Sequence, residues 1–458
     1  MPFKYNPPTR THCPVCEQIN ERDLNPVIDS HNGKASSASY FPFHNWYYFV
    51  LGYSPEYPDY IIKKEKISDK HFVVDPFMGA ATTLVCCKNK SIKSGGVEAN
   101  DFFKFASDVK LNWELDPKKL RHIHKDLLTK IEKRLGKFKW KGKGDQTLIT
   151  NYKSGEANLE EYAKENRPKL LLPKYMCDQV FVKVDQIKLA IEELKFDSVE
   201  EKNLFILALS SILVPVSNIR YGPGFGVGKP KIDADVLLVF NEKVERMISD
   251  IESKINSKEI EFETYLGDAR CLSQYFKNNS VDFMITSPPY PGDHEYTKHS
   301  KIELVFLNMA NDLLEFRSIK KRMLRGSTTN IYKDDNDGDH IMHLPDIKAV
   351  TDEIEIRLKT DGATSGFEKL YTKLIREYFG GMYLMFKEAY KILKPGGRFA
   401  LLVSDSHAFK MVHIKTAHLL AQVAKEAGFE KTEIELWQFK NSTSHKYKLL
   451  ENTLTVQK

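Results

Sequence analysis

The sequence predicts an α/β protein built on a doubly wound, mostly parallel sheet, with a C-terminal antiparallel hairpin and a mainly helical insertion. Two short segments carry most of this prediction, because each follows an apolar run of strand length. The first is a glycine-containing turn after Phe72-Val73-Val74, and the second is a proline-rich turn after Val281–Thr286. Apolar runs and amphipathic segments alternate around both turns, which is typical of strands connected by helices.

The first turn joins a predicted strand to a predicted helix, and it reads Asp75-Pro76-Phe77-Met78-Gly79-Ala80-Ala81-Thr82-Thr83. Gly79 permits close approach of a ligand to the backbone, and the helix N-terminus beyond it favours an anionic group. The next predicted strand, residues 96–100, places Glu98 about 20 residues beyond the turn, the spacing at which a carboxylate reaches ribose hydroxyls in dinucleotide-binding folds. An acid at a strand end is also compatible with a helix cap.

The α/β alternation stops between residues 101 and 260, where helical periodicity dominates, in 118–135, 178–194 and 199–213. Residues 234–240 are expected to form a strand. We therefore predict four parts, namely an N-terminal segment, a first part of the sheet domain, an insertion and a second part of the sheet domain, at residues 1–71, 72–100, 101–260 and 261–458. The aromatic residues of 41–62 are expected either to form one wall of a ligand pocket or to pack against the sheet.

The α/β pattern returns near Asp268, an acid at the end of another predicted strand. Residues 310–370 are charged and are expected to form a surface excursion. A predicted amphipathic helix over 371–393 stops at Pro395 and Gly396, and an apolar strand follows. The chain then continues as a helix and two closing strands, over 414–427, 430–439 and 446–456.

The second turn reads Ser287-Pro288-Pro289-Tyr290. Methylation of an exocyclic amine requires its nitrogen lone pair to be exposed, and acceptors for the amino hydrogens assist this. The Ser287 hydroxyl and the Pro288 carbonyl are two such acceptors, and the two prolines hold them in a fixed arrangement. Tyr290 supplies a ring that can stack on a base. Because a paired base cannot reach such a pocket, the target must flip out of the duplex. The alternative interpretation is a plain Pro-Pro turn.

Together, the two turns resemble the S-adenosylmethionine-dependent DNA amino-methyltransferases, and in particular the cytosine-N4 type of restriction-modification systems. The first motif of that family usually reads Asp-Pro-Phe-x-Gly-x-Gly-Thr-Thr, and its second glycine is Ala81 here. The resemblance covers residues 72–100 and 265–310 well and 380–458 more loosely. It includes the runs His294-Glu295-Tyr296-Thr297 and Glu451-Asn452. It implies a seven-stranded methyltransferase sheet and S-adenosylmethionine as the cofactor.

The resemblance also implies roles for individual residues. Asp75 would receive the methionyl ammonium group, Glu98 the ribose hydroxyls and Asp268 the adenine amino group. The implied cofactor-binding set is Asp75, Pro76, Phe77, Met78, Gly79, Thr82, Thr83, Glu98, Ala99, Asp268 and Ala269. The implied catalytic set is Ser287, Pro288, Pro289 and Tyr290. Serine at position 287 favours cytosine N4 over adenine N6, for which Asp or Asn is commoner.

The net charge of +6 is modest, but basic residues are concentrated in one stretch. Between Lys118 and Lys143 there are eleven Lys or Arg and two acids, with Phe138 and Trp140 among the last lysines. This pattern suits binding to double-stranded DNA, and a solvated surface explains it equally well. The candidate DNA contacts are Lys137, Lys139, Trp140, Lys141, Lys143 and, in a glycine-rich loop, Arg220.

The six cysteines do not resemble a disulfide framework, which favours a reducing, cytoplasmic location. Cys13 and Cys16 have the spacing of half a zinc site, but no second pair follows, so we expect no metal. The first residues contain no apolar h-region, so we expect no secretory signal, and no apolar run is long enough to cross a membrane.

The sequence thus predicts a site-specific DNA methyltransferase acting on cytosine N4. Close alternatives are adenine N6 of DNA and an amino group of RNA. A module that binds nucleic acid without catalysis is a different class, and the intact second turn argues against it. A restriction endonuclease of the same specificity is an expected partner.

Overall fold

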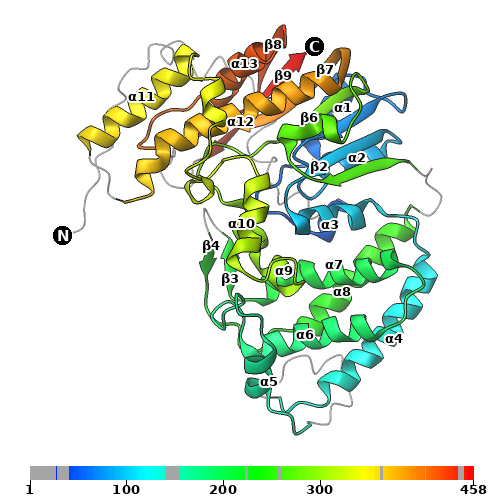
Figure 1. Ribbon diagram of the computed structural model, residues 1–458. Helices are drawn as coiled ribbons and strands as arrows, with labels where there is room; N and C mark the ends of the chain where they lie inside the picture. Colours follow the sequence, from blue (N-terminus) through cyan, green and yellow to red (C-terminus); the bar gives the residue numbers. More distant parts are fainter. Residues whose placement is uncertain are drawn as a thin grey trace.

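The computed structural model describes residues 27, 41–140, 155–221, 225–254, 260–361, 365–407, 409–441 and 448–458. Figure 1 shows a lobe built on the sheet and, below it, a lobe made mainly of helices. Within the described residues, no helix is long and apolar enough to cross a membrane.

The main sheet has seven strands in the order β5-β2-β1-β6-β7-β9-β8. Their bounds are β1 (Phe72–Asp75), β2 (Lys93–Glu98), β5 (Phe262–Leu266), β6 (Val281–Thr286), β7 (Leu393–Ser404), β8 (Lys431–Asn441) and β9 (Lys448–Gln457). The first five strands pair in parallel, and β9 pairs antiparallel with both β7 and β8. This confirms the predicted doubly wound sheet and its C-terminal hairpin.

The strand order reverses between β1 and β6. The chain builds outward from β1 through β2 to β5, and then resumes on the other side of β1 with β6 and β7. Val74 of β1 is in register with Met284 of β6, so the carboxyl ends of these two strands lie at the same edge. Ligands of open α/β sheets bind in the crevice at such a reversal. The two turns found in the sequence follow these two strands.

Alternate residues of the central strands enter two different apolar clusters. Val74 and Met284 pack with α12 (Tyr371–Ile392) and α13 (Thr416–Glu426). Val73 and Ile285 pack on the other face, in a cluster with residues of α1 and α2. The period of two is that of strands buried on both faces. The helices on the second side are α1 (Glu56–Lys64), α2 (Thr82–Asn89) and α3 (Asp101–Leu111).

The helical lobe consists of α4 to α8 with one short hairpin. Its elements are α4 (Pro117–Leu135), α5 (Leu159–Asn166), α6 (Asp178–Glu193), α7 (Val199–Val216), β3 (Ile219–Tyr221), β4 (Phe225–Val227) and α8 (Val236–Glu252). The predicted helical insertion is confirmed, but the strand expected over 234–240 is wrong. Residues 236–240 are the first of α8, in which Phe240, Val244, Met247 and Ile251 recur at helical spacing and are buried.

The charged excursion is packed onto the sheet lobe. It begins after α9 (Lys301–Phe306) and contains α10 (Leu313–Arg322) and α11 (Pro345–Thr360). Ile347 and Ile354 of α11 are fully buried in the same cluster as α12. Arg322, the last residue of α10, donates hydrogen bonds to the Ala99 carbonyl and the Asp101 carboxylate, at 3.2 and 2.5 Å. This contact brings the excursion to the carboxyl end of β2.

Candidate active site

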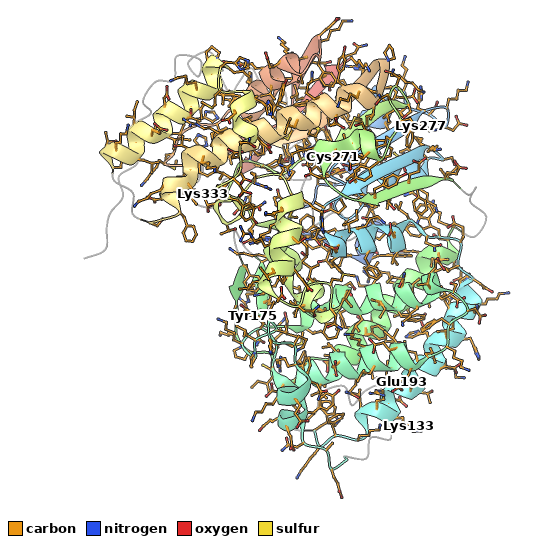
Figure 2. All side chains as sticks on the ribbon, in the orientation of Figure 1. Lys133, Tyr175, Glu193, Cys271, Lys277 and Lys333 are labelled. Atoms are coloured by element: carbon orange, nitrogen blue, oxygen red, sulfur yellow. The ribbon has the colours of Figure 1, made fainter. Side chains whose placement is uncertain are left out.

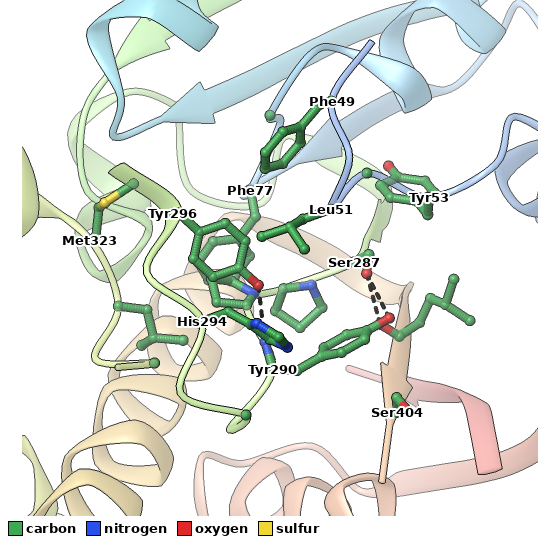
Figure 3. Close-up of a pocket in the computed structure, with 18 of the residues that line it drawn as sticks. Phe49, Leu51, Tyr53, Phe77, Ser287, Tyr290, His294, Tyr296, Met323 and Ser404 are labelled. Carbon is green, nitrogen blue, oxygen red and sulfur yellow. Dashed lines mark hydrogen bonds between the residues drawn. The ribbon is translucent and has the colours of Figure 1, made fainter. Parts of the chain in front are cut away.

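Both turns line one cavity of about 1290 Å³ at the carboxyl edge of the sheet. Figure 3 shows part of its wall, with Ser287 and Tyr290 facing Phe49, Leu51 and Tyr53 across the space. Most of the residues predicted from the sequence line it, namely Pro76, Phe77, Met78, Gly79, Thr82, Glu98, Ala99, Asp268, Ala269, Ser287, Pro288, Pro289 and Tyr290. The aromatic segment forms another part of the wall, through His44 and residues 47–54.

Asp75 lies beneath the cavity wall and is fully buried. Its carboxylate accepts hydrogen bonds from the Tyr53 hydroxyl (2.9 Å), the Phe77 amide (3.0 Å) and the Thr286 hydroxyl. Burial raises the pKa of Asp75 to about 6, although these hydrogen bonds oppose the rise. Thr83 is buried as well and donates to the Ile285 carbonyl, at 3.2 Å. These two predicted cofactor residues therefore join β1, β6 and the aromatic segment instead of facing the cavity.

The glycine turn is held from one side by α3. The Ser107 hydroxyl donates to the Gly79 carbonyl (2.8 Å), and the Lys110 ammonium donates to the Ala80 carbonyl (2.5 Å). Gly79 has φ +52°, and a Cβ added there would meet nothing closer than 3.9 Å, so its cavity side is open. Ala81 adopts φ 63°, the left-handed conformation in which glycine is at no disadvantage.

Glu98 ends β2 beside this turn and is 8% exposed. One carboxylate oxygen accepts the Gly79 amide at 2.7 Å, and the other accepts the Asn100 amide at 2.8 Å. Burial raises the pKa of Glu98 to about 7. The carboxylate has lone pairs beyond those used by these two amides, so it can accept a further hydroxyl from the cavity.

Asp268 is held by a charged cluster that sequence reasoning missed. The Arg270 guanidinium contacts both Asp268 oxygens, at 2.6–3.1 Å, and also donates to Asp337 at 2.5 Å. Arg322 and Met323, from the end of α10, line the cavity near this cluster. Figure 3 shows Met323 at its rim. The excursion thus contributes a wall that no local pattern indicated.

The Ser287 hydroxyl lies 3.1 Å from both the Tyr290 hydroxyl and the Leu402 carbonyl. The Tyr290 hydroxyl donates to Glu451 of β9 at 3.0 Å, and burial raises the pKa of Tyr290 well above its usual range. The Tyr290 amide donates to the Tyr296 hydroxyl at 3.4 Å, and Figure 3 draws the bonds of Ser287 and Tyr296 to Tyr290. From the sequence, only the ring face of Tyr290 had an expected role; its hydroxyl proves to be bonded too.

The predicted DNA contacts are not gathered at one place. Arg220 is exposed on β3, next to Tyr221, whose hydroxyl donates to the His299 carbonyl near the cavity. Lys137 and Lys139 are exposed and follow α4, close to Lys133, which Figure 2 places at the end of the helical lobe remote from the sheet. Trp140 is half-buried, and its indole N–H donates to the Leu135 carbonyl at 2.9 Å.

Several sequence predictions fall elsewhere. Lys141 and Lys143, and the candidate half-site of Cys13 and Cys16, lie outside the described residues. Across the ranges that the structure describes, no group of three or more His, Cys, Asp or Glu side chains is placed to hold a metal ion.

The cavity fits a nucleoside cofactor together with a flat second ligand. Its volume exceeds the roughly 300–1000 Å³ of a typical small-molecule site, which leaves room for both. Gly79 offers an open backbone surface, and Glu98 offers acceptors for hydroxyl groups. Apolar side chains, including Phe49, Leu51 and Phe77, enclose the rest.

Comparison with known proteins gives sequence similarity over most of the chain. It is 23% identical over 427 residues to the Type II methyltransferase M.BsoBI of Geobacillus stearothermophilus, covering 85% of this chain and 79% of that protein. This chain is also 22% identical over 421 residues to the Type II methyltransferase M.AvaI of Nostoc sp., and the match covers 86% of this chain and 80% of that protein. A shorter match of 120 residues, 32% identical, joins 25% of the chain to 22% of the Type II methyltransferase M.MjaII of Methanocaldococcus jannaschii.

No family model and no solved structure matches the chain. Type II methyltransferases use S-adenosylmethionine as methyl donor, which agrees with the cavity and with the two turns that line it. The similarity over most of the sequence, the sheet order and the position of both turns identify the chain as a homologue of the Type II methyltransferases.

Proposed function

We propose that the chain is a site-specific DNA methyltransferase that transfers a methyl group from S-adenosylmethionine to the N4 amino group of a flipped-out cytosine. One observation carries the proposal: the glycine turn after β1 and the Ser-Pro-Pro-Tyr turn after β6 line the same cavity at the reversal of the sheet. In this arrangement a cofactor surface would lie beside an amine-acceptor surface, which supports the proposal.

The cofactor supplies an electrophilic methyl group carried on a sulfonium. Gly79 would approach its methionyl part, and Glu98 its ribose hydroxyls, as the open backbone and the free lone pairs of these residues suggest. Asp268, held by Arg270, would accept from the adenine amino group. Asp75 would act beneath the surface by holding the Phe77 amide and the Thr286 hydroxyl in place.

The second turn would draw the amino hydrogens of the target base away from its nitrogen lone pair. Ser287 and the Pro288 carbonyl are the acceptors, and the prolines fix both before the base arrives. Both residues line the cavity, so a base must leave the duplex to reach them. The Tyr290 ring would stack on the flipped base.

Serine at position 287 favours cytosine, as in the family that the motif resembles. Adenine N6 of DNA is the second candidate, because its amino group needs similar acceptors.

Arg220 on β3, near the cavity, is our first candidate for a phosphate contact, and Lys137, Lys139 and Trp140 remain candidates on a longer duplex. An endonuclease of the same specificity belongs to the proposal, since the relatives are Type II methyltransferases.

The proposal is tested by transfer of a labelled methyl group from S-adenosylmethionine to duplex DNA and to RNA of the same sequence. We expect label in DNA only.

Ser287→Ala should slow single-turnover transfer by on the order of 10²–10³-fold, with cofactor affinity unchanged, because one fixed acceptor is lost. Ser280→Ala, just before the start of β6 and away from the cavity, is the matched control. Equal rates in both variants would remove Ser287 from the mechanism.

A further inference from the structure

We propose that Glu451 sets the direction of the hydrogen bonds around Ser287, and thereby makes the base pocket accept an amino edge and reject a carbonyl edge. The inference rests on the proposed function of the cavity and adds a specificity-determining residue to it. Glu451 acts through Tyr290, so it is a positioning residue.

Glu451 is 1% exposed and lies on β9, between β7 and the edge strand β8. On β9 it is in register with Ser404 of β7 on one side and Gln438 of β8 on the other. Its carboxylate receives hydrogen bonds from the Tyr290 hydroxyl, the Gln438 amide and the Lys440 ammonium. All three partners are donors here, so the carboxylate is the acceptor in each of these bonds.

An ionised carboxylate can only accept, so the single hydrogen of the Tyr290 hydroxyl is committed to Glu451. The Tyr290 oxygen can then only accept from Ser287. The other neighbour of Ser287 is the Leu402 carbonyl, which also only accepts. The single Ser287 hydrogen is therefore used by one of these two acceptors. What Ser287 offers to the cavity is a lone pair.

The direction of this bond determines which base edge fits. The amino group of cytosine donates a hydrogen to the Ser287 lone pair, whereas the carbonyl at the same position in uracil presents a second acceptor to it. Two acceptors facing each other in a buried site leave both unsatisfied, which is costly. A site built to bond one polar group discriminates strongly against its replacement.

Replacing Glu451 by Gln would relax this constraint on the Ser287 hydrogen. The Tyr290 hydroxyl and the Lys440 ammonium share one Glu451 oxygen, and the Gln438 amide donates to the other. A glutamine therefore places its NH₂ group either at the oxygen that faces Gln438 or at the oxygen shared by Tyr290 and Lys440. In the second arrangement the Tyr290 oxygen accepts from the new amide, and its own hydrogen turns to Ser287. Of the two acceptors that flank Ser287, the Leu402 carbonyl alone then competes for its hydrogen, so Ser287 can turn that hydrogen to a carbonyl edge more readily.

The chain offers a matched control on the neighbouring strand. Glu435 of β8 accepts from the Tyr60 hydroxyl (2.9 and 3.0 Å) and from the Lys64 ammonium (2.9 Å), so it has the same kinds of partner as Glu451. Neither Glu435 nor Tyr60 lines the cavity. Glu435→Gln therefore measures how the loss of a Tyr–Glu–Lys cluster affects the sheet when the cavity is left unchanged.

The test is binding of the full chain to duplexes that carry cytosine or uracil at the methylated position, opposite an abasic site so that no pairing must be broken. If the methylated base is adenine, the pair becomes adenine and hypoxanthine. We expect wild-type protein and Glu435→Gln to prefer the amino base by about tenfold or more. Glu451→Gln should reduce that ratio severalfold, to about threefold or less, with S-adenosylmethionine affinity unchanged.

Tyr290→Phe breaks the same link without disturbing the bonds of Glu451 to Gln438 and Lys440, so it serves if Glu451→Gln folds poorly. Combining it with Glu451→Gln should lower the ratio no further than Tyr290→Phe alone, because Glu451 acts through the Tyr290 hydroxyl. A wild-type preference retained in Glu451→Gln, or equal binding of both bases by a wild type that methylates DNA, overturns the inference alone. A wild type that does not methylate DNA overturns the proposed function, and the inference with it.

Discussion

The Thr286 hydroxyl, at the end of β6, donates a hydrogen bond to the Asp75 carboxylate, at the end of β1. The two residues are 211 positions apart in the chain and are both fully buried. Each immediately adjoins one of the two turns that line the cavity. Asp75 is therefore the point at which the proposed cofactor surface and the proposed base surface are joined.

The hydrogen bond between Thr286 and Asp75 predicts that removal of one hydroxyl lowers the free energy of unfolding substantially. Thr286→Val removes only the hydroxyl and leaves the Asp75 carboxylate without one of its partners. We expect the free energy of unfolding to fall by about 1–3 kcal/mol, measured by denaturant titration. Thr264 donates to Asp108 away from the cavity, where both side chains are part-buried, so Thr264→Val should cost less. Equal losses of unfolding free energy in the two variants would mean that the Thr286–Asp75 hydrogen bond contributes no more than the Thr264–Asp108 hydrogen bond.

Ala81 predicts a gain in stability. Its φ of 63° costs an alanine roughly 1–2 kcal/mol relative to glycine, partly offset by the greater freedom of glycine in the unfolded chain. Ala81→Gly should therefore raise the free energy of unfolding by about 0.5–1 kcal/mol. The neighbouring Ala80 does not have a positive φ, so a glycine there relieves no strain. Ala80→Gly should therefore lower the free energy of unfolding by about 0.5–1 kcal/mol. A loss of stability in both variants would contradict the strain at position 81.

Glu98 predicts a pH dependence. Its folded-state pKa of about 7 lies above the ordinary 4.5, so the folded protein holds this proton more tightly than the unfolded chain. Its contribution to stability is present below pH 4.5 and is lost as the pH rises toward 7. Ionisation in turn provides the acceptor for ribose hydroxyls. Affinity for S-adenosylmethionine should thus increase about tenfold between pH 6 and 8. Calorimetry on Glu98→Gln should show weaker binding with that increase absent, and an unchanged pH profile would refute the assignment.

Arg220 predicts a change in the salt dependence of DNA binding. If it contacts one phosphate, Arg220→Gln should lower the slope of log affinity against log salt by about 0.9 on a short duplex centred on the target. Lys137 and Lys139 follow the end of α4, close to Lys133, which Figure 2 shows far from the sheet, so they should affect only long duplexes. A wild-type slope in Arg220→Gln would place the DNA elsewhere.

Much of the fold followed from local pattern, because strands buried on both faces are continuous apolar runs and their turns carry glycine or proline. The start of α8 was mistaken for a strand because Val236 to Phe240 form a short apolar run that either element can produce. The helical period becomes visible only when the run is extended to Ile251.

The site was predictable where its chemistry lies in one turn, as in Ser287 to Tyr290. It was not predictable where the partner is distant in sequence. Glu451 is 161 residues from Tyr290, and Arg322 is 223 residues from Ala99. The Glu451-Asn452 run is part of the family resemblance, but its contact with Tyr290 depends on the antiparallel return of β9. The contact of Arg322 with Ala99 depends on the packing of α10, and no motif records either contact.

The most direct test of the central claim is mass spectrometry of nucleosides from duplex DNA that has been incubated with the purified protein and S-adenosylmethionine carrying a deuterated methyl group. The account predicts deuterated N4-methylcytosine at one defined sequence, and its near absence with Ser287→Ala. Deuterated N6-methyladenine would change the base but keep the amine chemistry. DNA without label, or label at the C5 carbon of cytosine, would contradict the account.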